Sequence, residues 1–190
     1  MIQSVTGVVL AGGKSSRMGR NKALLPFGAG TLLESVIAKV QTVFERVVLS
    51  VHEEGAYPQI TLPQVADRYP ETGPMGAIAS LLEAGESRIF CVACDMPFLN
   101  ASLIEYLCSF TDCDAVVPVW RGRMESLHAL YSDALLPAFQ ALLRENRFKV
   151  ADALLEAHVR YVGEEEIRKI DARGDSFRNV NTPREFEELS

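Results

Sequence analysis

The chain has 190 residues, of which 48% are apolar and 23% charged, and its net charge is −6. An acidic chain lacks the basic face of a general nucleic-acid binder, and no apolar run approaches the roughly 20 residues of a membrane span. Residues 1–4 also lack the basic start of a signal peptide. We therefore expect a cytoplasmic protein with no nucleic-acid and no membrane partner, in which residues 1–190 form a single domain.

Strand-like and helix-like segments alternate along the chain. In order, they are a strand at Val5–Leu10, a helix at Leu32–Gln41, strands at Val47–Val51 and Gln59–Val65, a helix at Gly76–Glu83, a strand at Arg88–Cys94, a helix at Ser102–Phe110, a strand at Asp114–Val119, a helix at Asp133–Leu143, a helix at Lys149–Glu156 and a strand at His158–Val162. Thr31 and Glu34 predict a capping box, and Asp133 is a predicted helix cap. Trp120–Tyr131 is either a hairpin or a loop, and Thr182 begins a final helix.

Continuous apolar strands separated by helices predict an α/β fold, with a mostly parallel sheet and helices on both faces. Ligands of such sheets bind at the carboxyl ends of the strands. The loop after Leu10 and the carboxylate of Asp95 both follow predicted strands. If those strands are parallel, the loop and the carboxylate lie at the same edge.

The segment from Leu10 to Lys22 has the composition of a phosphate-binding loop. Gly12 and Gly13 let the backbone approach a ligand closely, and Arg17 and Lys22 add positive charge beside it. An ordinary glycine turn with a solvated basic stretch is the alternative. A Walker A motif is excluded, because it would need a further glycine where Val8 stands.

Asp95 directly follows a predicted buried strand and precedes Met96 and Pro97. Facing a triphosphate, such a carboxylate is suited to bind Mg²⁺, which takes one or two carboxylates together with phosphate oxygens and water. The alternative role, capping the next helix, is disfavoured because Asp95 stands too far before Ser102.

Two further polar loops are candidates for the site. Asp67 precedes a turn with Gly73 and Pro74, which opens the next predicted helix. Asn179 and Asn181 either coordinate a metal or substrate or cap the final helix.

Cys91 and Cys94 form a C-x-x-C pair that raises the question of a zinc site. The pair lies in a continuous apolar run, where residues three apart face opposite sides of a sheet. We therefore favour buried thiols over a zinc site.

These motifs together resemble the molybdenum cofactor guanylyltransferases of the nucleotidyltransferase class. The resemblance rests on Leu10-Ala11-Gly12-Gly13, Arg17-Met18-Gly19, Lys22, Asp67, Gly73-Pro74-Met75, Cys94-Asp95-Met96-Pro97 and Asn179-Val180-Asn181-Thr182-Pro183. It implies a Rossmann-like fold of the nucleotide-diphospho-sugar transferase type. It also implies an enzyme that uses Mg²⁺ to transfer GMP from GTP to the phosphate of molybdopterin or Mo-molybdopterin, with release of pyrophosphate.

The resemblance also implies a role for each matching residue. The nucleotide would contact Leu10, Ala11, Gly12, Gly13, Lys22, Ser50, Asp67 and Asp95. Arg17, Lys22 and Asp95 would be catalytic, with Asp95 as the metal ligand, and Asn179 and Asn181 would lie on the acceptor side. Molybdoenzyme chaperones would be further partners, which the sequence does not identify.

The match departs from the family at several positions. Asn21 stands where many relatives have Asp, and Ser50 where an Asn often helps to bind guanine. Gly12, where cytidine-using relatives have Ala, favours GTP over CTP. Arg121 and Arg123 lie in a segment that resembles the acceptor side, where a solvated turn is an equal alternative.

Two other functions remain open at this level. One is a related nucleotidyltransferase that uses CTP or a sugar or alcohol phosphate. The other is a nucleotide-binding module without catalysis, which the presence of Arg17, Lys22 and Asp95 together disfavours.

Overall fold

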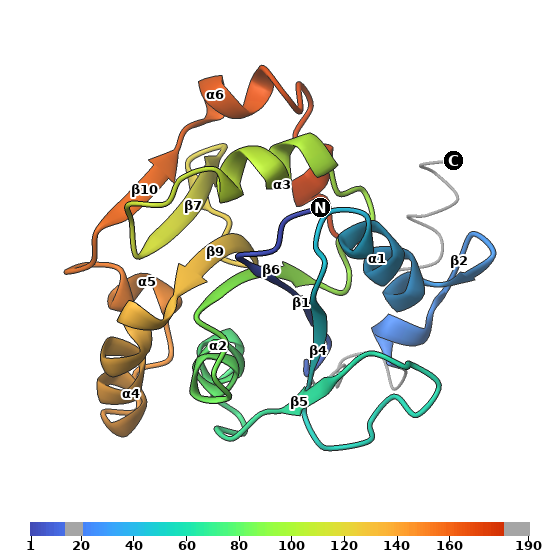
Figure 1. Cartoon of the computed structure of the whole chain (residues 1–190), viewed down its shortest axis with the longest axis horizontal. Coiled ribbons are helices and arrows are strands. Elements are labelled where there is room, and N and C mark those ends of the chain that lie inside the picture. Colours follow the sequence, from blue (N-terminus) through green and yellow to red (C-terminus); the bar gives the residue numbers. More distant parts are fainter. Residues whose placement is uncertain (14–20, 181–190) are drawn as a thin grey trace.

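The computed structural model describes residues 1–13 and 21–180, and an eight-stranded sheet forms its centre (Figure 1). Across the sheet the strand order is β10-β7-β9-β6-β1-β4-β5, and β8 pairs with β7. The strands are β1 (Thr6–Leu10), β4 (Val47–Val51), β5 (Gln64–Ala66), β6 (Arg88–Ala93), β7 (Ala115–Trp120), β8 (Arg123–Met124), β9 (His128–Ser132) and β10 (Val159–Val162). A separate hairpin consists of β2 (Pro26–Phe27) and β3 (Gly30–Thr31).

The sheet is mostly parallel, as predicted. β1 pairs in parallel with both β4 and β6, and the pairs β4–β5 and β7–β10 are parallel as well. β9 lies antiparallel between β6 and β7, because the chain returns after β7 through β8. Of the two alternatives for Trp120–Tyr131, the hairpin is therefore correct.

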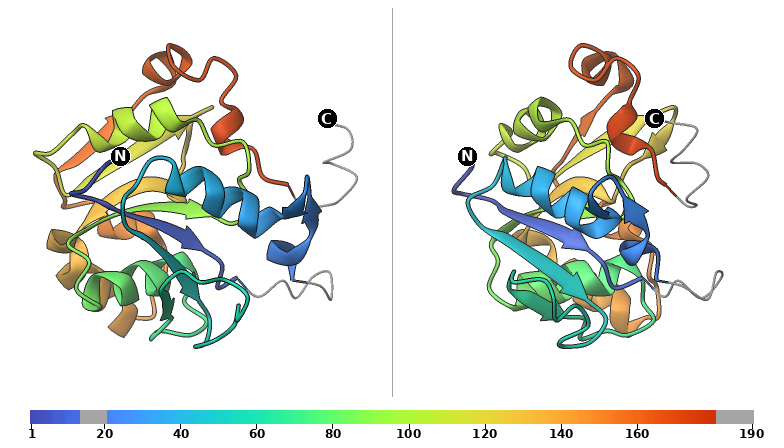
Figure 2. Two further views of the ribbon diagram at one scale, coloured as in Figure 1. Left: turned by 45° about the vertical axis from the view of Figure 1, so that its right-hand side comes forward. Right: turned by 90° about the vertical axis from the view of Figure 1, so that its right-hand side faces the viewer.

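Helices cover both faces of this sheet, which confirms the predicted architecture (Figures 1 and 2). The α-helices are α1 (Leu32–Gln41), α2 (Pro74–Glu83), α3 (Ala101–Cys108), α4 (Leu136–Arg144), α5 (Val150–Ala153) and α6 (Glu164–Arg168). Short 3₁₀ helices occur at Lys22–Leu24, Asp133–Leu135 and Asp175–Phe177. One hydrophobic core joins α1, α3 and α6 to the sheet, and the other joins α2, α4 and α5 to the opposite face.

The alternation of side chains along the central strands produces these two cores. In β1, Val9 belongs to the core under α1 and α3, whereas its neighbour Val8 belongs to the core under α2 and α4. In β6, Phe90 and Cys91 divide between the same two cores. Strands buried on both faces therefore need continuous apolar sequence.

The predicted capping box at the start of α1 is present. The Thr31 hydroxyl accepts a hydrogen bond from the Glu34 N–H at 3.3 Å, and the Glu34 carboxylate accepts one from the Thr31 N–H at 2.7 Å. Local sequence thus determines where this helix begins.

Two predicted elements differ from the structure for reasons that involve proline. Within the strand predicted at 59–65, only Gln64 and Val65 pair with β4, and the paired strand extends to Ala66. Pro63 has no N–H to donate to a longer ladder. Asp133 begins a 3₁₀ helix and does not cap α4, which starts at Leu136 with Pro137 in its first turn.

The two cysteines of the C-x-x-C pair lie on opposite faces of the sheet. Cys91 is fully buried in one core, and Cys94 packs against the other. Burial raises the pKa of the Cys94 thiol to about 12. This placement agrees with the interpretation of the pair as thiols of the protein interior.

The helix predicted from Thr182 onward lies outside the described residues. Within residues 1–13 and 21–180, no helix is both long and apolar enough to cross a bilayer.

A buried carboxylate ties together the amino-terminal edge of the sheet. Glu86 is only 9% exposed and accepts hydrogen bonds from the Thr6 hydroxyl at 2.6 Å and from Arg46 Nη2 at 2.6 Å. Burial raises the pKa of Glu86, but the hydrogen bonds from Arg46 and Thr6 outweigh it and leave the pKa below its ordinary value.

We predict that Glu86→Ala lowers the free energy of unfolding by about 1–3 kcal/mol, because a buried hydroxyl loses its partner. The half-exposed Arg46 side chain contributes little to the loss, since water solvates it. The difference in unfolding free energy between the unaltered protein and Glu86→Ala should be complete at neutral pH. It should shrink as the pH falls through the lowered pKa of Glu86, below 4.5. Urea unfolding at several pH values tests this, with Glu156→Ala at an exposed position as the control. Equal stability of Glu86→Ala and the control at neutral pH would contradict the prediction.

Candidate functional site

The segment from Leu10 to Lys22, which we call the glycine loop, begins at the same edge of the sheet as Asp95. The Cys94 N–H donates to the Leu10 carbonyl at 3.1 Å, and the Ala11 N–H donates to the Ser50 carbonyl at 2.9 Å. The ends of β6, β1 and β4 are therefore in register, and the predicted parallel arrangement is confirmed.

Gly12 lies close to the end of β4. A Cβ atom added at Gly12 would stand 3.3 Å from the backbone nitrogen of His52, whereas one at Gly13 would meet no atom within 4 Å. Gly12 therefore needs a small residue because of the neighbouring backbone, and Gly13 does not.

Asp95 is a half-buried carboxylate near a positive charge. Burial raises its pKa, and the charge of Lys22, at the start of a short 3₁₀ helix, acts in the opposite direction. Asp95 does not cap α3, because Asn100 occupies that position and accepts the Leu103 N–H at 3.2 Å. The side chain is therefore not used as a helix cap.

The segment that carries Asn179 lies beside Asp95. The Val180 N–H donates to the Asp95 carbonyl at 2.8 Å, and Asn179 is exposed. Just before it, the Ser176 hydroxyl accepts the Asn100 N–H at 2.9 Å, so this segment packs on the start of α3 (Figure 2). Asn181 and Arg17 lie outside the described residues.

Asp67 stands at the end of β5, on the other side of β4. Its Oδ1 accepts the Tyr69 N–H at 2.8 Å and the Ser80 hydroxyl at 3.2 Å. Burial raises its pKa, and these two hydrogen bonds act against the rise. The carboxylate thus also shapes the turn that leads through Gly73 into α2, where Gly73 has a φ of 67°.

Ser50 lies inside β4 and is 1% exposed. Its carbonyl contacts the glycine loop through the hydrogen bond from Ala11. The role of Ser50 at the nucleotide base remains a prediction.

His128, the histidine of the segment that resembles the acceptor side, is fully buried in β9. Its ring lies edge-on to Phe90 and Phe177, and neither ring nitrogen has a hydrogen-bond partner among the described residues. Burial lowers its pKa to about 3, so the imidazole is neutral at physiological pH.

Tyr57 connects Ala11, near the start of the glycine loop, with Asn21, near its end. The sequence did not indicate this role. Its hydroxyl donates to the Ala11 carbonyl at 3.1 Å and accepts from Asn21 Nδ2 at 2.9 Å. Asn21 Oδ1 in turn accepts the Ala23 N–H and caps the 3₁₀ helix that begins at Lys22. We call Ala11, Tyr57 and Asn21 the tyrosine clasp. At position 21 an Asp has no amide N–H to donate to the tyrosine hydroxyl.

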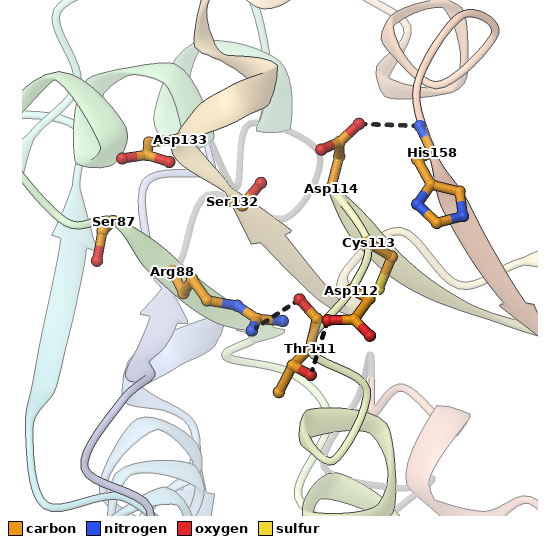
Figure 3. A pocket seen from close by; sticks show the side chains of 9 residues that line it. All are labelled: Ser87, Arg88, Thr111, Asp112, Cys113, Asp114, Ser132, Asp133 and His158. Atoms are coloured by element: carbon orange, nitrogen blue, oxygen red, sulfur yellow. Dashed lines mark hydrogen bonds between the residues drawn. The ribbon is translucent and has the colours of Figure 1, made fainter.

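A pocket of about 470 Å³ lies at the opposite edge of the sheet (Figure 3). Its walls include Arg88 at the start of β6, Asp114 before β7 and His158 before β10. The Asp114 carboxylate accepts the His158 N–H at 2.9 Å. None of the predicted site residues that the structure describes lines this pocket, so the candidate site is the carboxyl edge.

A family model described as a MobA-like NTP transferase domain matches residues 7–161. This range begins within β1 and ends within β10, and it contains the glycine loop, Asp67 and Asp95. The chain belongs to the MobA-like NTP transferase family.

Curated relatives of this family match over nearly their full length. A probable molybdenum cofactor guanylyltransferase of Pelotomaculum thermopropionicum is 37% identical, over 96% of this chain and 90% of the relative. Another, of Carboxydothermus hydrogenoformans, is 32% identical over 99% of this chain and 96% of the relative.

Solved structures of other proteins share the fold. Molybdopterin-guanine dinucleotide biosynthesis protein A of Archaeoglobus fulgidus superposes with a TM-score of 0.84 at 24% identity, covering 97% of this chain and 96% of its own. The 2-C-methyl-D-erythritol 4-phosphate cytidylyltransferase of Thermus thermophilus has a TM-score of 0.68 at 18% identity, with 95% of each chain covered. The predicted nucleotide-diphospho-sugar transferase fold is thus confirmed.

We predict that Tyr57→Phe weakens binding of GTP, the nucleotide that the family resemblance implies, by roughly threefold to tenfold. The variant keeps the buried ring but removes the hydroxyl that joins Ala11 to Asn21, so Ala11 and Lys22 lose their fixed spacing. Calorimetric titration with GTP measures the effect. Tyr161→Phe, at an exposed tyrosine of β10, is the matched control. An unchanged affinity in Tyr57→Phe would show that the clasp does not position the loop.

Proposed function

We propose that the chain transfers GMP from GTP to the phosphate of molybdopterin or Mo-molybdopterin, and that it releases pyrophosphate. Membership of the MobA-like NTP transferase family carries the proposal. The names of its curated relatives and the common sheet edge of the glycine loop and Asp95 support it.

In the proposed reaction, an oxygen of the acceptor phosphate attacks the α-phosphorus of GTP in line. The bond from that phosphorus to the bridging oxygen breaks, and the bridging oxygen leaves with pyrophosphate. No covalent intermediate with the protein is needed, so catalysis rests on positioning and on compensation of negative charge. In this scheme Arg17 and Lys22 hold the phosphates against the backbone of Leu10–Gly13.

Asp95 is the proposed ligand for Mg²⁺. A half-buried carboxylate at the strand ends suits an ion that keeps most of its coordination for phosphate oxygens and water. Among the described residues there is no cluster of three or more His, Cys, Asp or Glu side chains that would form a complete metal cage. When bound, the ion would compensate the charge that develops on the transferred phosphoryl group.

The remaining site residues are assigned to the two substrates. Ser50 and Asp67 are proposed to contact the nucleotide, and Asn179 and Asn181 the acceptor. The exposed position of Asn179 beside Asp95 supports the acceptor assignment. We further propose that residues 1–190 work as one domain and that molybdoenzyme chaperones receive the product.

The overall proposal is tested by incubating the protein with Mg²⁺, molybdopterin and each nucleoside triphosphate in turn while pyrophosphate release is followed. Release with GTP, and much less with CTP, is the expected result. Release with CTP or only with a sugar phosphate would assign the chain to another nucleotidyltransferase reaction. Nucleotide binding without any release would indicate a binding module.

We predict that Lys22→Ala and Asp95→Ala each lower turnover by about 10²–10³, by analogy with the loss of one electrostatic contact in other enzymes. Both side chains lie at the edge of the sheet, and the backbone of Asp95 still accepts the Val180 N–H. The thermal unfolding midpoint should therefore stay near that of the unaltered protein. Lys39→Ala, at an exposed position of α1, controls for the loss of a positive charge. Turnover like that of the unaltered protein would remove the residue concerned from the mechanism.

We predict that Gly12→Ala lowers kcat/KM for GTP by about tenfold and affects CTP less, because the added methyl group takes space from a larger base. The methyl group would crowd the His52 backbone at 3.3 Å, so the loop must shift. Gly13→Ala provides the comparison, since its Cβ has no neighbour within 4 Å and tests only the loss of backbone freedom. Equal losses for GTP and CTP in Gly12→Ala would contradict the role in base selection.

A further inference from the structure

A second pocket, of about 530 Å³, lies at the end of β7, next to the segment that follows α6. Arg121, Arg168, Arg173 and Arg178 surround it, with Trp120 and Phe177 among its walls. We call these six residues the arginine pocket. Of these six residues, the sequence singled out only Arg121 as a candidate for the acceptor side, with a solvated turn as an equal alternative.

Positive charge exceeds negative charge in the arginine pocket. Asp175 forms ion pairs with both Arg173 and Arg178, at 2.8 and 2.9 Å, and Glu164 pairs with Arg168 at 2.6 Å. Among the described residues, the four guanidinium groups around the pocket thus stand against these two carboxylates, in a chain whose net charge is −6. Such a local excess of positive charge favours an anionic ligand.

The aromatic side of the pocket is closely packed. Arg168 lies over the Trp120 ring at 4.9 Å from its centroid, and the Phe177 ring centroid is 5.8 Å from that of Trp120. On Gly174, a Cβ would stand 2.2 Å from Trp120, so only glycine permits this approach. Planar guanidinium groups beside an indole are suited to a planar, anionic ligand.

The tight turn between β7 and β8 fixes the position of Arg121 at the pocket. Arg121 has a φ of 48°, a left-handed conformation that non-glycine residues rarely adopt. Its N–H donates to the Glu164 carboxylate at 3.0 Å, which holds this conformation. Gly122, at the other turn position, has a φ of 74°, so both positive φ angles belong to the two-residue turn between β7 and β8.

The segment that follows α6 connects the arginine pocket to Asp95. Arg178 lies over the Phe98 ring at 5.4 Å, and two residues later the Val180 N–H donates to the Asp95 carbonyl. The proposed nucleotide residues lie on the β1, β4 and β5 side of β6, whereas the pocket lies beyond β9 at β7. Asp95 therefore stands between the proposed nucleotide side and this pocket.

We propose that the arginine pocket binds the part of the acceptor that lies beyond its reacting phosphate, a ring system that carries an anionic dithiolate. This inference rests on the proposed function, which supplies an acceptor of that chemistry. The pocket then selects the acceptor, and the glycine loop selects the nucleotide.

The chain offers a direct probe, because Trp120 is its only tryptophan. Titration of the full chain with metal-free molybdopterin should quench the tryptophan fluorescence in a saturable way, and GTP with Mg²⁺ should quench it far less. Saturable quenching by GTP alone would place the nucleotide at this pocket and overturn the inference. Absence of quenching by molybdopterin, in a protein that transfers GMP to it, would overturn it as well.

The matched variants are Arg173→Met and Lys169→Met. Arg173 is a pocket residue whose side chain is 83% exposed, so its loss should not unfold the chain. Lys169 lies 71% exposed just after α6, pairs with Glu165 and is not in the pocket. Arg173→Met should raise the KM and the dissociation constant for molybdopterin about tenfold, with kcat and GTP affinity unchanged. Lys169→Met should leave both the KM and the dissociation constant for molybdopterin unchanged.

An equal acceptor KM in Arg173→Met and Lys169→Met would overturn the role of the pocket while leaving the proposed function intact. Absence of GMP transfer by the unaltered protein would instead overturn the proposed function, and the acceptor assignment with it. A fall in kcat without a rise in acceptor KM would also count against the pocket as a binding site.

Discussion

The parallel pairing of β1 with β4 on one side and β6 on the other is the constraint on which the rest of the structure depends. It brings the chain after Leu10 and the chain after Ala93 to the same edge, through the hydrogen bond from Cys94 to Leu10. Neither the glycine loop nor Asp95 forms a site alone. Their proximity follows from backbone pairing that buried side chains on both faces of the sheet stabilise.

The two edges of this sheet use buried polar groups differently. At the amino edge, the two carboxylate oxygens of Glu86 accept hydrogen bonds from Thr6 and Arg46, and these bonds stabilise the fold. At the carboxyl edge, the tyrosine clasp uses a buried hydroxyl to join loop backbone to a helix cap, and Asp95 remains half-buried. Satisfied groups at one edge stabilise the sheet, while the other edge keeps groups available for ligands.

Charge is also distributed unevenly over an acidic chain. Lys22 beside Asp95 and the arginines around Trp120 create local positive regions on the two sides of β6. If the proposed function is correct, two anionic substrates approach one carboxylate from opposite directions. Separate cationic regions would then bring their reacting phosphates together against electrostatic repulsion.

The sequence by itself determined the strands, most helices and the class of chemistry, because apolar runs, capping residues and glycine loops act over a few neighbouring residues. It did not determine that Pro63 would shorten β5, that Asp133 would not cap α4, or that β9 would enter the sheet antiparallel. Those outcomes depend on hydrogen-bond partners elsewhere in the chain.

Only the tertiary structure decided which distant residues complete the candidate site. Tyr57 reaches Ala11 across 46 positions, Val180 reaches Asp95, and Gly174 packs on Trp120. None of these contacts has a local pattern, since each arises from two segments that the folded sheet brings together. The residues of a phosphate-binding loop can thus be recognised from sequence, whereas their positioning partners and the arginine pocket exist only in the folded chain.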